Sequence, residues 1–332
     1  MKNHRPAVRP EPRLPIKLLA LDIDGTIVDH DFRISERTVA AIRGAVERGV
    51  RVSLATGRMP SSAVLYANRL GLTEPIIGHQ GAIVRAMPVR REPPPPDNSG
   101  PTFRGRVGRI LHHEGLAPAV VREAIEWCRA NGLDPHVNDR EHIVVWRDDP
   151  SFEDYSGYLG PDAEIVPDLA GAINRPMTKV ISVGEPPRPR ELYPVAQAYF
   201  AGRADATLSH PRFLEFVAPG VSKGKAVAWL AHRADIPMAQ VMAIGDAFND
   251  IEMIGDAGHG AAMGTAPTAV RLAGRYIAPP VGEDGSAALI EQLILASPEE
   301  AAMNMERLTL EAAATQAELR AAQAAAAAAA GC

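Results

Sequence analysis

The chain is poor in cysteine, has no excess of basic residues and contains no long apolar run. Its 332 residues include 2 cysteines, Cys128 and Cys332, which offer no disulfide framework and suit a reducing compartment. A formal net charge of −5 argues against a general nucleic-acid-binding protein. No window approaches the apolar length of a membrane-spanning helix, and residues 1–15 lack the apolar centre of a secretory signal. We therefore expect a cytoplasmic monomer or weak homodimer without nucleic-acid or membrane partners.

The most informative segment that is present is an apolar run that ends in two carboxylates. Leu18–Leu21 is followed by Asp22, Ile23, Asp24 and Gly25. Short apolar runs closed by a glycine are typical of buried parallel strands, and ligands of open α/β sheets bind at the carboxyl ends of such strands. In an extended segment, side chains two residues apart point to the same side, so Asp22 and Asp24 should lie close together. Two neighbouring carboxylates repel each other unless a cation or a shared proton lies between them. In isolation, the same four residues would be a strand that ends in an Asp-Gly turn.

Three further motifs follow in order, each at the end of a predicted strand or the start of a predicted helix. The β-type run 50–55 ends in Thr56-Gly57-Arg58, and the run 241–244 ends in Gly245-Asp246-Ala247-Phe248-Asn249-Asp250. Between them, Val221-Ser222-Lys223-Gly224-Lys225 opens a helical stretch. Each motif alone is a weak signal, but four in sequence make coincidence improbable.

This set of motifs resembles the haloacid dehalogenase-type phosphatases, and most closely their Cof-like branch with a large type IIB cap. The resemblance covers residues 16–295. It implies an α/β fold, in which a doubly wound parallel sheet forms a Rossmannoid core and an α+β cap domain is inserted. It also implies a phosphatase that depends on magnesium and acts on small phosphate monoesters.

The pattern along the chain agrees with this organisation. We expect a flexible N-terminal extension over 1–15, a catalytic core over 16–85 and 212–297, and a cap over 86–211 that sets substrate specificity. A proline-rich loop over 93–101 opens the cap, and residues 298–332 form an alanine-rich helix or tail that is exposed or frayed. Apolar periodicity predicts helices over 37–48, 61–70, 119–130 and 190–200. A third β segment is expected to begin at Ile76 and to continue through Val84.

The resemblance assigns the chemistry to the two carboxylates after the first strand. It makes Asp22 the nucleophile, which forms an aspartyl-phosphate. It makes Asp24 the acid that protonates the leaving oxygen and then the base that activates water. Magnesium prefers few carboxylates and several waters, which Asp22 and Asp246 would suit. The main-chain carbonyl of Asp24 is a further expected ligand. Asp250 is expected either to ligate the metal directly or to support the site, and we favour the supporting role.

Phosphate binding is expected from the other motifs. Thr56 offers a hydroxyl, Gly57 a backbone N–H, Lys223 a positive charge and Asn249 a neutral donor. Family spacing selects Lys223 over the neighbouring Lys225. For Arg58 two interpretations stay open, a phosphate or cap contact and a structural ion pair. Gln80 stands where the family often has asparagine.

Two other functions are compatible with the same motifs. A phosphosugar mutase or transferase would use the same core but would have to protect the aspartyl-phosphate from water. A non-catalytic ligand-binding protein could keep the fold, although the intact carboxylates and lysine argue against it. Substrate choice depends on the cap, where a group of polar and aromatic residues either lines a pocket or belongs to a surface hairpin with its turn at 138–141; we favour the hairpin for most of them. The group comprises His136, Asn138, Asp139, Arg140 and Trp146.

Overall fold

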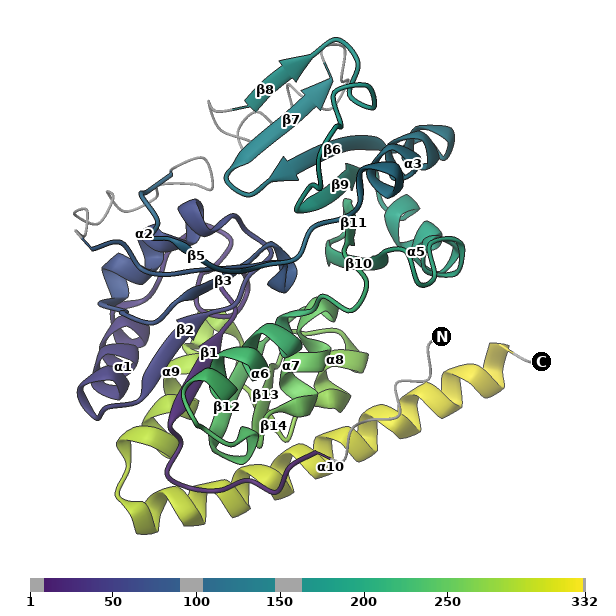
Figure 1. The fold of residues 1–332 in the computed structure, drawn as a ribbon. Coiled ribbons are helices and arrows are strands. Elements are labelled where there is room, and N and C mark those ends of the chain that lie inside the picture. The colour runs from purple at the N-terminus through teal and green to yellow at the C-terminus, as the bar shows by residue number, and fades with distance from the viewer. Residues whose placement is uncertain (1–8, 90–103, 147–162, 331–332) are drawn as a thin grey trace. The chain divides into compact units, whose positions relative to one another are not determined.

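The structure, a computed structural model, describes residues 9–89, 104–146 and 163–330 (Figure 1). The chain divides into two compact units, which we call the middle unit (residues 53–227) and the terminal unit (residues 4–52 and 228–332). Their boundaries fall inside strand β2 (Arg51–Leu54) and helix α6 (Lys223–Arg233). The middle unit thus groups two of the four sequence motifs with the inserted segment. The predicted division into a core over 16–85 and 212–297 and a cap over 86–211 stays a prediction.

The terminal unit is organised around a parallel sheet. The strand order is β14-β13-β12-β1-β2, and the pairs β1–β12, β12–β13 and β13–β14 are parallel. All four residues of β1 are buried, as its unbroken apolar sequence predicts, and Leu21 lies opposite Ile244. The carboxyl ends of β1 and β12 therefore lie side by side. The strands besides β2 are β1 (Leu18–Leu21), β12 (Val241–Gly245), β13 (His259–Met263) and β14 (Tyr276–Ala278).

Helices accompany this sheet, and the α/β class with a Rossmannoid core is confirmed. Helix α1 begins where the Ser35 side chain accepts a hydrogen bond from the Thr38 N–H at 3.0 Å. The helices are α1 (Glu36–Glu47), α7 (Ile251–Asp256), α8 (Thr268–Ala273), α9 (Gly285–Ile290) and α10 (Pro298–Ala330), with short turns of helix η2 (Met238–Gln240), η3 (Phe248–Asp250), η4 (Val281–Glu283) and η5 (Glu291–Leu295).

The chain ends of the described part lie against the terminal unit. Helix α10, the long yellow helix of Figure 1, buries Ala301, Leu308 and Ala312, and most of its other residues are exposed or half-buried. Over the described residues, α10 agrees with the alanine-rich helix expected at this end. Within the predicted N-terminal extension, Arg13 N–H donates to Ala239 O at 2.8 Å, so residues 9–15 are anchored; residues 1–8 lie outside the described residues. In the described part of the chain, no helix is long and apolar enough to cross a membrane.

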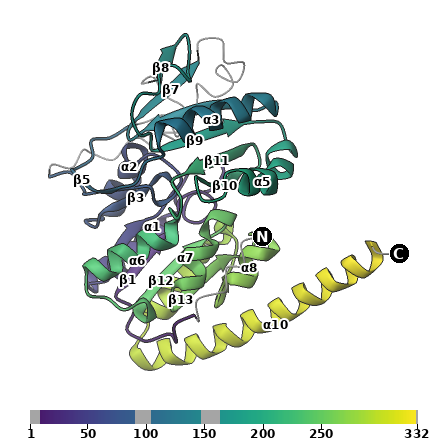
Figure 2. The same ribbon diagram turned by 45° about the vertical axis from the view of Figure 1, so that its right-hand side comes forward.

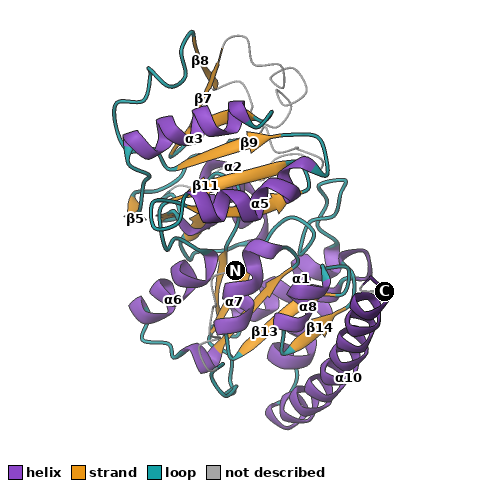
Figure 3. Cartoon of the chain, turned by 90° about the vertical axis from the view of Figure 1, so that its right-hand side faces the viewer, coloured by secondary structure: helices purple, strands orange, loops and turns teal. Residues whose placement is uncertain are grey.

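The middle unit contains two sheets. A six-stranded sheet has the order β10-β11-β9-β6-β7-β8, and a three-stranded antiparallel sheet has the order β3-β4-β5. Helices α3 and α5 pack on one face of the larger sheet (Figures 2 and 3), where Phe200 stacks edge-on against Phe216 with 5.0 Å between ring centroids. The elements besides β2 and α6 are β3 (Ile76–Gly78), η1 (His79–Gly81), β4 (Ile83–Arg85), β5 (Ile110–His113), α2 (Pro60–Leu70), α3 (Pro118–Ala130), β6 (Asp134–Asp139), β7 (His142–Trp146), β8 (Ala163–Val166), β9 (Lys179–Val183), α5 (Arg188–Tyr199), β10 (Asp205–His210) and β11 (Phe213–Val217).

The expected third β segment is wrong in one respect. Instead of one strand through Val84, the chain turns at η1 and returns as β4, antiparallel to β3. Gln80 adopts a left-handed conformation (φ +63°) that ends the first strand. A non-glycine residue in this conformation leaves no periodic signal in the sequence, which is why the turn was missed.

The expected hairpin is present, but it is less exposed than a surface hairpin. Strands β6 and β7 pair antiparallel around a turn at Arg140 and Glu141. His136, Asn138 and Asp139 are buried, since β6 also pairs with β9 and lies inside the sheet. The proline-rich loop 93–101 lies outside the described residues.

Candidate active site

Three carboxylates converge at the ends of β1 and β12 in the terminal unit. Asp22, Asp246 and Asp250 each offer one ligand atom, and these atoms all lie within 4.8 Å of one another. Asp22 follows β1 directly and is buried, and its N–H donates to Ile244 O at 3.0 Å. Parallel pairing of two buried strands thus brings together residues more than 200 positions apart.

Gly25 is required by the close approach of Asp246. A Cβ at Gly25 would lie 2.4 Å from Asp246 Oδ2, and the φ of +75° is unfavourable for other residues. The Gly25 N–H donates to Val28 O, which closes the turn after β1. The Asp24 side chain is exposed beside this turn and lies outside the carboxylate cluster. The expected ligation through its main-chain carbonyl stays a prediction.

Asp250 is held by the backbone of its own motif. Its Oδ2 accepts hydrogen bonds from the N–H groups of Asp246 and Ala247, at 3.0 and 2.9 Å. The carboxylate folds back over Gly245, where a Cβ would lie 2.5 Å from Asp250 Cγ. Asp250 therefore orients the turn that carries Asp246, which agrees with the supporting role. Asn249 lies half-buried in η3 of the same turn, and its part in phosphate binding stays a prediction.

The carboxylate cluster fits a hard divalent cation. All three groups offer oxygen, which such ions prefer, and one oxygen of Asp250 is already taken by two N–H donors. Asp22 and Asp246 are then the carboxylates best placed as direct ligands. The site can hold a metal ion, and its donors are those that magnesium uses.

In the middle unit, the loop after β2 contains two hydrogen-bond donors, one on the buried Thr56 and one on the half-buried Gly57. Arg58 N–H donates to Thr56 Oγ1 at 3.1 Å, so the hydroxyl hydrogen of Thr56 remains available for an acceptor. The main-chain groups of Thr56 are used by Ile77 O and the Gln80 N–H. Among the described residues, no acceptor bonds to the Gly57 N–H. A loop with a free hydroxyl hydrogen and a free N–H is suited to an anion.

Lys223 lies next to the turn η1, which also contacts this loop. It is the first residue of α6 and is buried, whereas Lys225 is exposed, which supports the selection of Lys223. Gly81 of η1 packs directly on the start of α6, because a Cβ there would lie 2.2 Å from Ser222 O. On its other side, η1 contacts the loop, since a Cβ at Gly57 would lie 2.5 Å from Gln80 Nε2. Around η1 the middle unit thus gathers the threonine, the glycine and the lysine that the motifs single out.

Arg58 stacks on an aromatic ring. Its guanidinium carbon lies 5.2 Å from the centre of the Tyr66 ring, and Nη1 donates to the Tyr66 hydroxyl at 3.3 Å. The contact comes from α2, which follows the loop. Its role toward phosphate stays a prediction.

Two charged residues near this loop were missed in the sequence. Lys179 of β9 and Glu215 of β11 are both buried, with 2.9 Å between Lys179 Nζ and Glu215 Oε2. Each stands in an otherwise mostly apolar β-type run, Lys-Val-Ile-Ser-Val and Phe-Leu-Glu-Phe-Val. A single charge inside such a run is a signal for a buried partner of opposite sign.

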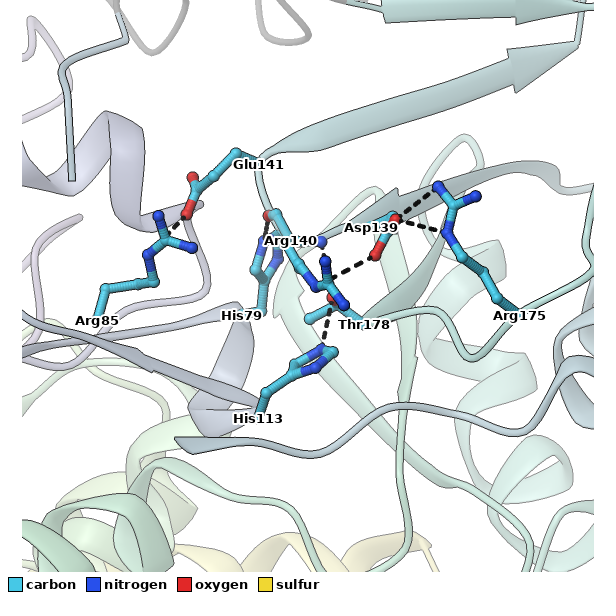
Figure 4. Close-up of polar contacts among 8 residues, drawn as sticks. All are labelled: His79, Arg85, His113, Asp139, Arg140, Glu141, Arg175 and Thr178. Carbon is cyan, nitrogen blue, oxygen red and sulfur yellow. Dashed lines mark hydrogen bonds and ion pairs between the residues drawn. The ribbon is translucent and has the colours of Figure 1, made fainter. Parts of the chain in front are cut away.

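Two members of the predicted cap group, Asp139 and Arg140, make polar contacts with residues outside the group around the β6–β7 turn (Figure 4). His79 Nε2 donates to Arg140 O at 2.5 Å, and burial lowers the pKa of His79 to about 3, so the ring is neutral. Asp139 Oδ2 accepts from Arg175 at 2.7 Å, and the Arg140 N–H donates to Thr178 Oγ1 at 2.7 Å. These contacts hold the hairpin in place, while Asn138 Oδ1 and Asp139 Oδ1 are buried without a hydrogen-bond partner among the described residues.

Comparisons with known proteins agree with the motifs. The family described as haloacid dehalogenase-like hydrolase matches residues 19–91 and 105–290. The chain is 26% identical to the 5-amino-6-(5-phospho-D-ribitylamino)uracil phosphatase YitU of Bacillus subtilis over 83% of this chain and 96% of the relative. It is 28% identical to the HMP-PP phosphatase of Cronobacter sakazakii, over 75% of this chain and 85% of the relative.

A solved structure shows the same fold. A haloacid dehalogenase-like hydrolase from Bacteroides thetaiotaomicron superposes with a TM-score of 0.66 at 27% identity, and the match covers 83% of this chain and 99% of that one. The expected resemblance to Cof-like phosphatases is confirmed.

Proposed function

The chain belongs to the haloacid dehalogenase-like hydrolases and is a phosphoric monoester hydrolase, and on this premise we propose that it hydrolyses small phosphorylated metabolites with magnesium as cofactor. The observation that carries the proposal is the convergence of Asp22, Asp246 and Asp250 at two neighbouring strand ends. The exposed Asp24 lies two residues from Asp22.

In the proposed reaction, Asp22 attacks phosphorus through a carboxylate oxygen and the bond to the leaving oxygen breaks. Asp24 gives its proton to that oxygen, so that the alcohol leaves neutral. Asp24 then takes a proton from water as the water attacks the aspartyl-phosphate, which releases inorganic phosphate and restores Asp22. This order returns both carboxylates to their starting state.

Charge neutralisation makes the attack of one anion on another possible. Magnesium held by Asp22 and Asp246 would neutralise negative charge on the phosphate. The Thr56 hydroxyl, the Gly57 N–H and the Lys223 ammonium are the proposed phosphate donors, and Asn249 and Arg58 are proposed to assist them. The free donors of the loop and the burial of Lys223 support these roles.

The names of the relatives suggest the substrate class. We propose a sugar phosphate or a similar small metabolite, because a cap inserted after the second motif would admit only substrates with small leaving groups. The cap over 86–211 is proposed to contact the leaving group.

The test is phosphate release from a panel of substrates, with magnesium and with excess chelator. The panel contains sugar phosphates, nucleotides, cofactor phosphates and the phosphorylated ribitylaminouracil for which the Bacillus relative is named. Magnesium-dependent release from a few members is expected. A folded protein that releases phosphate from no member would overturn the proposal.

A further inference from the structure

Lys179 and Glu215 form an ion pair that is almost fully buried. Lys179 is 4% and Glu215 1% exposed, and they come from the neighbouring strands β9 and β11. A buried ion pair is a poor source of stability, because the loss of hydration offsets most of the attraction between the charges. The pair therefore calls for a reason other than stability.

The Lys179 ammonium also reaches the loop after β2. Its Nζ donates to Gly57 O at 3.1 Å. The same peptide unit, between Gly57 and Arg58, uses its N–H to bond Thr56 Oγ1 at 3.1 Å. Both ends of this one peptide are thus tied, the carbonyl to Lys179 and the N–H to Thr56.

Glu215 binds the side-chain amide of Gln80, which packs against Gly57. Its Oε2 accepts from Gln80 Nε2 at 3.1 Å, in addition to Lys179, and Ser209 Oγ donates to its Oε1. The amide of Gln80 lies over the α-carbon of Gly57. One carboxylate therefore orients both the lysine below the peptide carbonyl and the amide that covers the glycine.

We infer that Lys179 and Glu215 are positioning residues for phosphate binding. They fix the 57–58 peptide in the one orientation in which its N–H occupies Thr56 Oγ1, so that the hydroxyl hydrogen of Thr56 and the Gly57 N–H both stay available as donors. Without Lys179 the carbonyl of this peptide loses its partner, and rotation of the peptide would release the threonine hydroxyl. The inference rests on the proposed function, in which this loop binds the phosphate.

The experiment compares three variants with the wild type: Lys179→Met, the double variant Lys179→Met/Glu215→Gln, and Lys225→Met as the matched control on an exposed lysine. The readouts are kcat and KM for p-nitrophenyl phosphate, the inhibition constant of inorganic phosphate, and the unfolding temperature. Lys179→Met should raise the inhibition constant and lower kcat/KM by about tenfold to a hundredfold, since small displacements of a binding group have effects of this size. Lys225→Met should match the wild type.

The double variant separates positioning from stability. It leaves no unpaired buried charge, and glutamine at 215 can still accept from Gln80, so the unfolding temperature should recover while phosphate inhibition stays weak. Recovery of wild-type inhibition in the double variant would show a merely structural pair and overturn the inference. In a Thr56→Val background, Lys179→Met should have only a few-fold effect, because the hydroxyl through which it acts is gone.

The inference and the proposed function fail in different ways. An active wild type whose inhibition by phosphate is unchanged in Lys179→Met overturns the inference alone. A folded wild type that hydrolyses nothing overturns the proposed function. Calorimetric titration of wild type and Lys179→Met with inorganic phosphate then decides the inference, which predicts weaker binding by the variant and is refuted by equal binding.

Discussion

The carboxylate cluster of the terminal unit and the donor loop of the middle unit are held by different kinds of contact. Asp250 is bound by two N–H groups of its own six-residue motif, and Gly25 makes room for Asp246. The loop at Thr56 instead depends on Gln80, Lys179 and Glu215, which are distant in sequence. The turn that carries Asp246 and Asp250 is thus held by local hydrogen bonds, and the loop at Thr56 by contacts between segments that are distant in sequence.

The largest effect is expected at Asp22, the proposed nucleophile. Asp22→Asn should lower kcat by about a thousandfold or more, because an amide cannot form the acyl phosphate, while folding and part of the magnesium affinity remain. Asp24→Ala is the companion variant and should slow both departure of the leaving group and hydrolysis of the intermediate. Steady-state and burst kinetics measure both; near-normal turnover by Asp22→Asn would remove the nucleophile assignment.

A smaller effect is expected at Asp250, which holds the turn that carries Asp246. Asp250→Asn weakens the acceptor for the N–H groups of Asp246 and Ala247, so the magnesium concentration for half-maximal activity should rise by about tenfold to a hundredfold. Glu299→Gln in the exposed helix α10 serves as the control for loss of one negative charge. An unchanged magnesium requirement in Asp250→Asn would contradict the supporting role.

Loss of the Thr56 hydroxyl, a proposed phosphate donor, should have a similar or smaller effect. Thr56→Val removes a hydroxyl that we expect to bond a charged phosphate, a bond of about 1.5–3 kcal/mol, so kcat/KM should fall roughly tenfold to a hundredfold. Thr56→Ser keeps the hydroxyl and should retain most of the activity. If valine and serine behave alike, the hydroxyl has no role in phosphate binding.

The smallest effect concerns stability and involves two buried histidines, His79 of the middle unit and His259 of the terminal unit. Burial lowers the pKa of His79 to about 3 and that of His259 to about 4, so both rings are neutral when folded. Unfolded histidine takes up a proton below pH 6.5, so stability is present at neutral pH and is lost as the pH falls below about 6.5. Each should contribute about 2 kcal/mol of destabilisation between pH 7 and 5.

Urea unfolding at pH 7 and pH 5 tests this for the wild type and for His79→Gln and His259→Gln separately. In each variant, the free energy of unfolding of the unit that holds the altered residue should fall less between pH 7 and pH 5 than it does in the wild type. Equal losses in all three proteins would show that other groups govern the acid sensitivity.

The contrast between the carboxylate cluster and the loop at Thr56 also explains which features could be predicted from the sequence. The strand before Asp22 was predicted from its short apolar run, and a helix was expected to open at Lys223; the structure has both. A lone charge in each apolar run indicates a buried partner for Lys179 and for Glu215, but the identity of that partner depends on the pairing of β9 with β11, which local sequence does not specify. The turn at Gln80 was missed for a related reason, since its left-handed backbone is stabilised by surroundings rather than by residue type.

By itself, the sequence determined the fold class, the parallel strands and the motif residues, because burial of short apolar runs and the glycine turns after them depend on neighbours along the chain. The tertiary structure alone decided that Asp22 and Asp246 meet at neighbouring strand ends, and that the buried Lys179, paired with Glu215, contacts the loop at Gly57. Those contacts join distant segments, and their geometry depends on strand register and packing rather than on any local pattern.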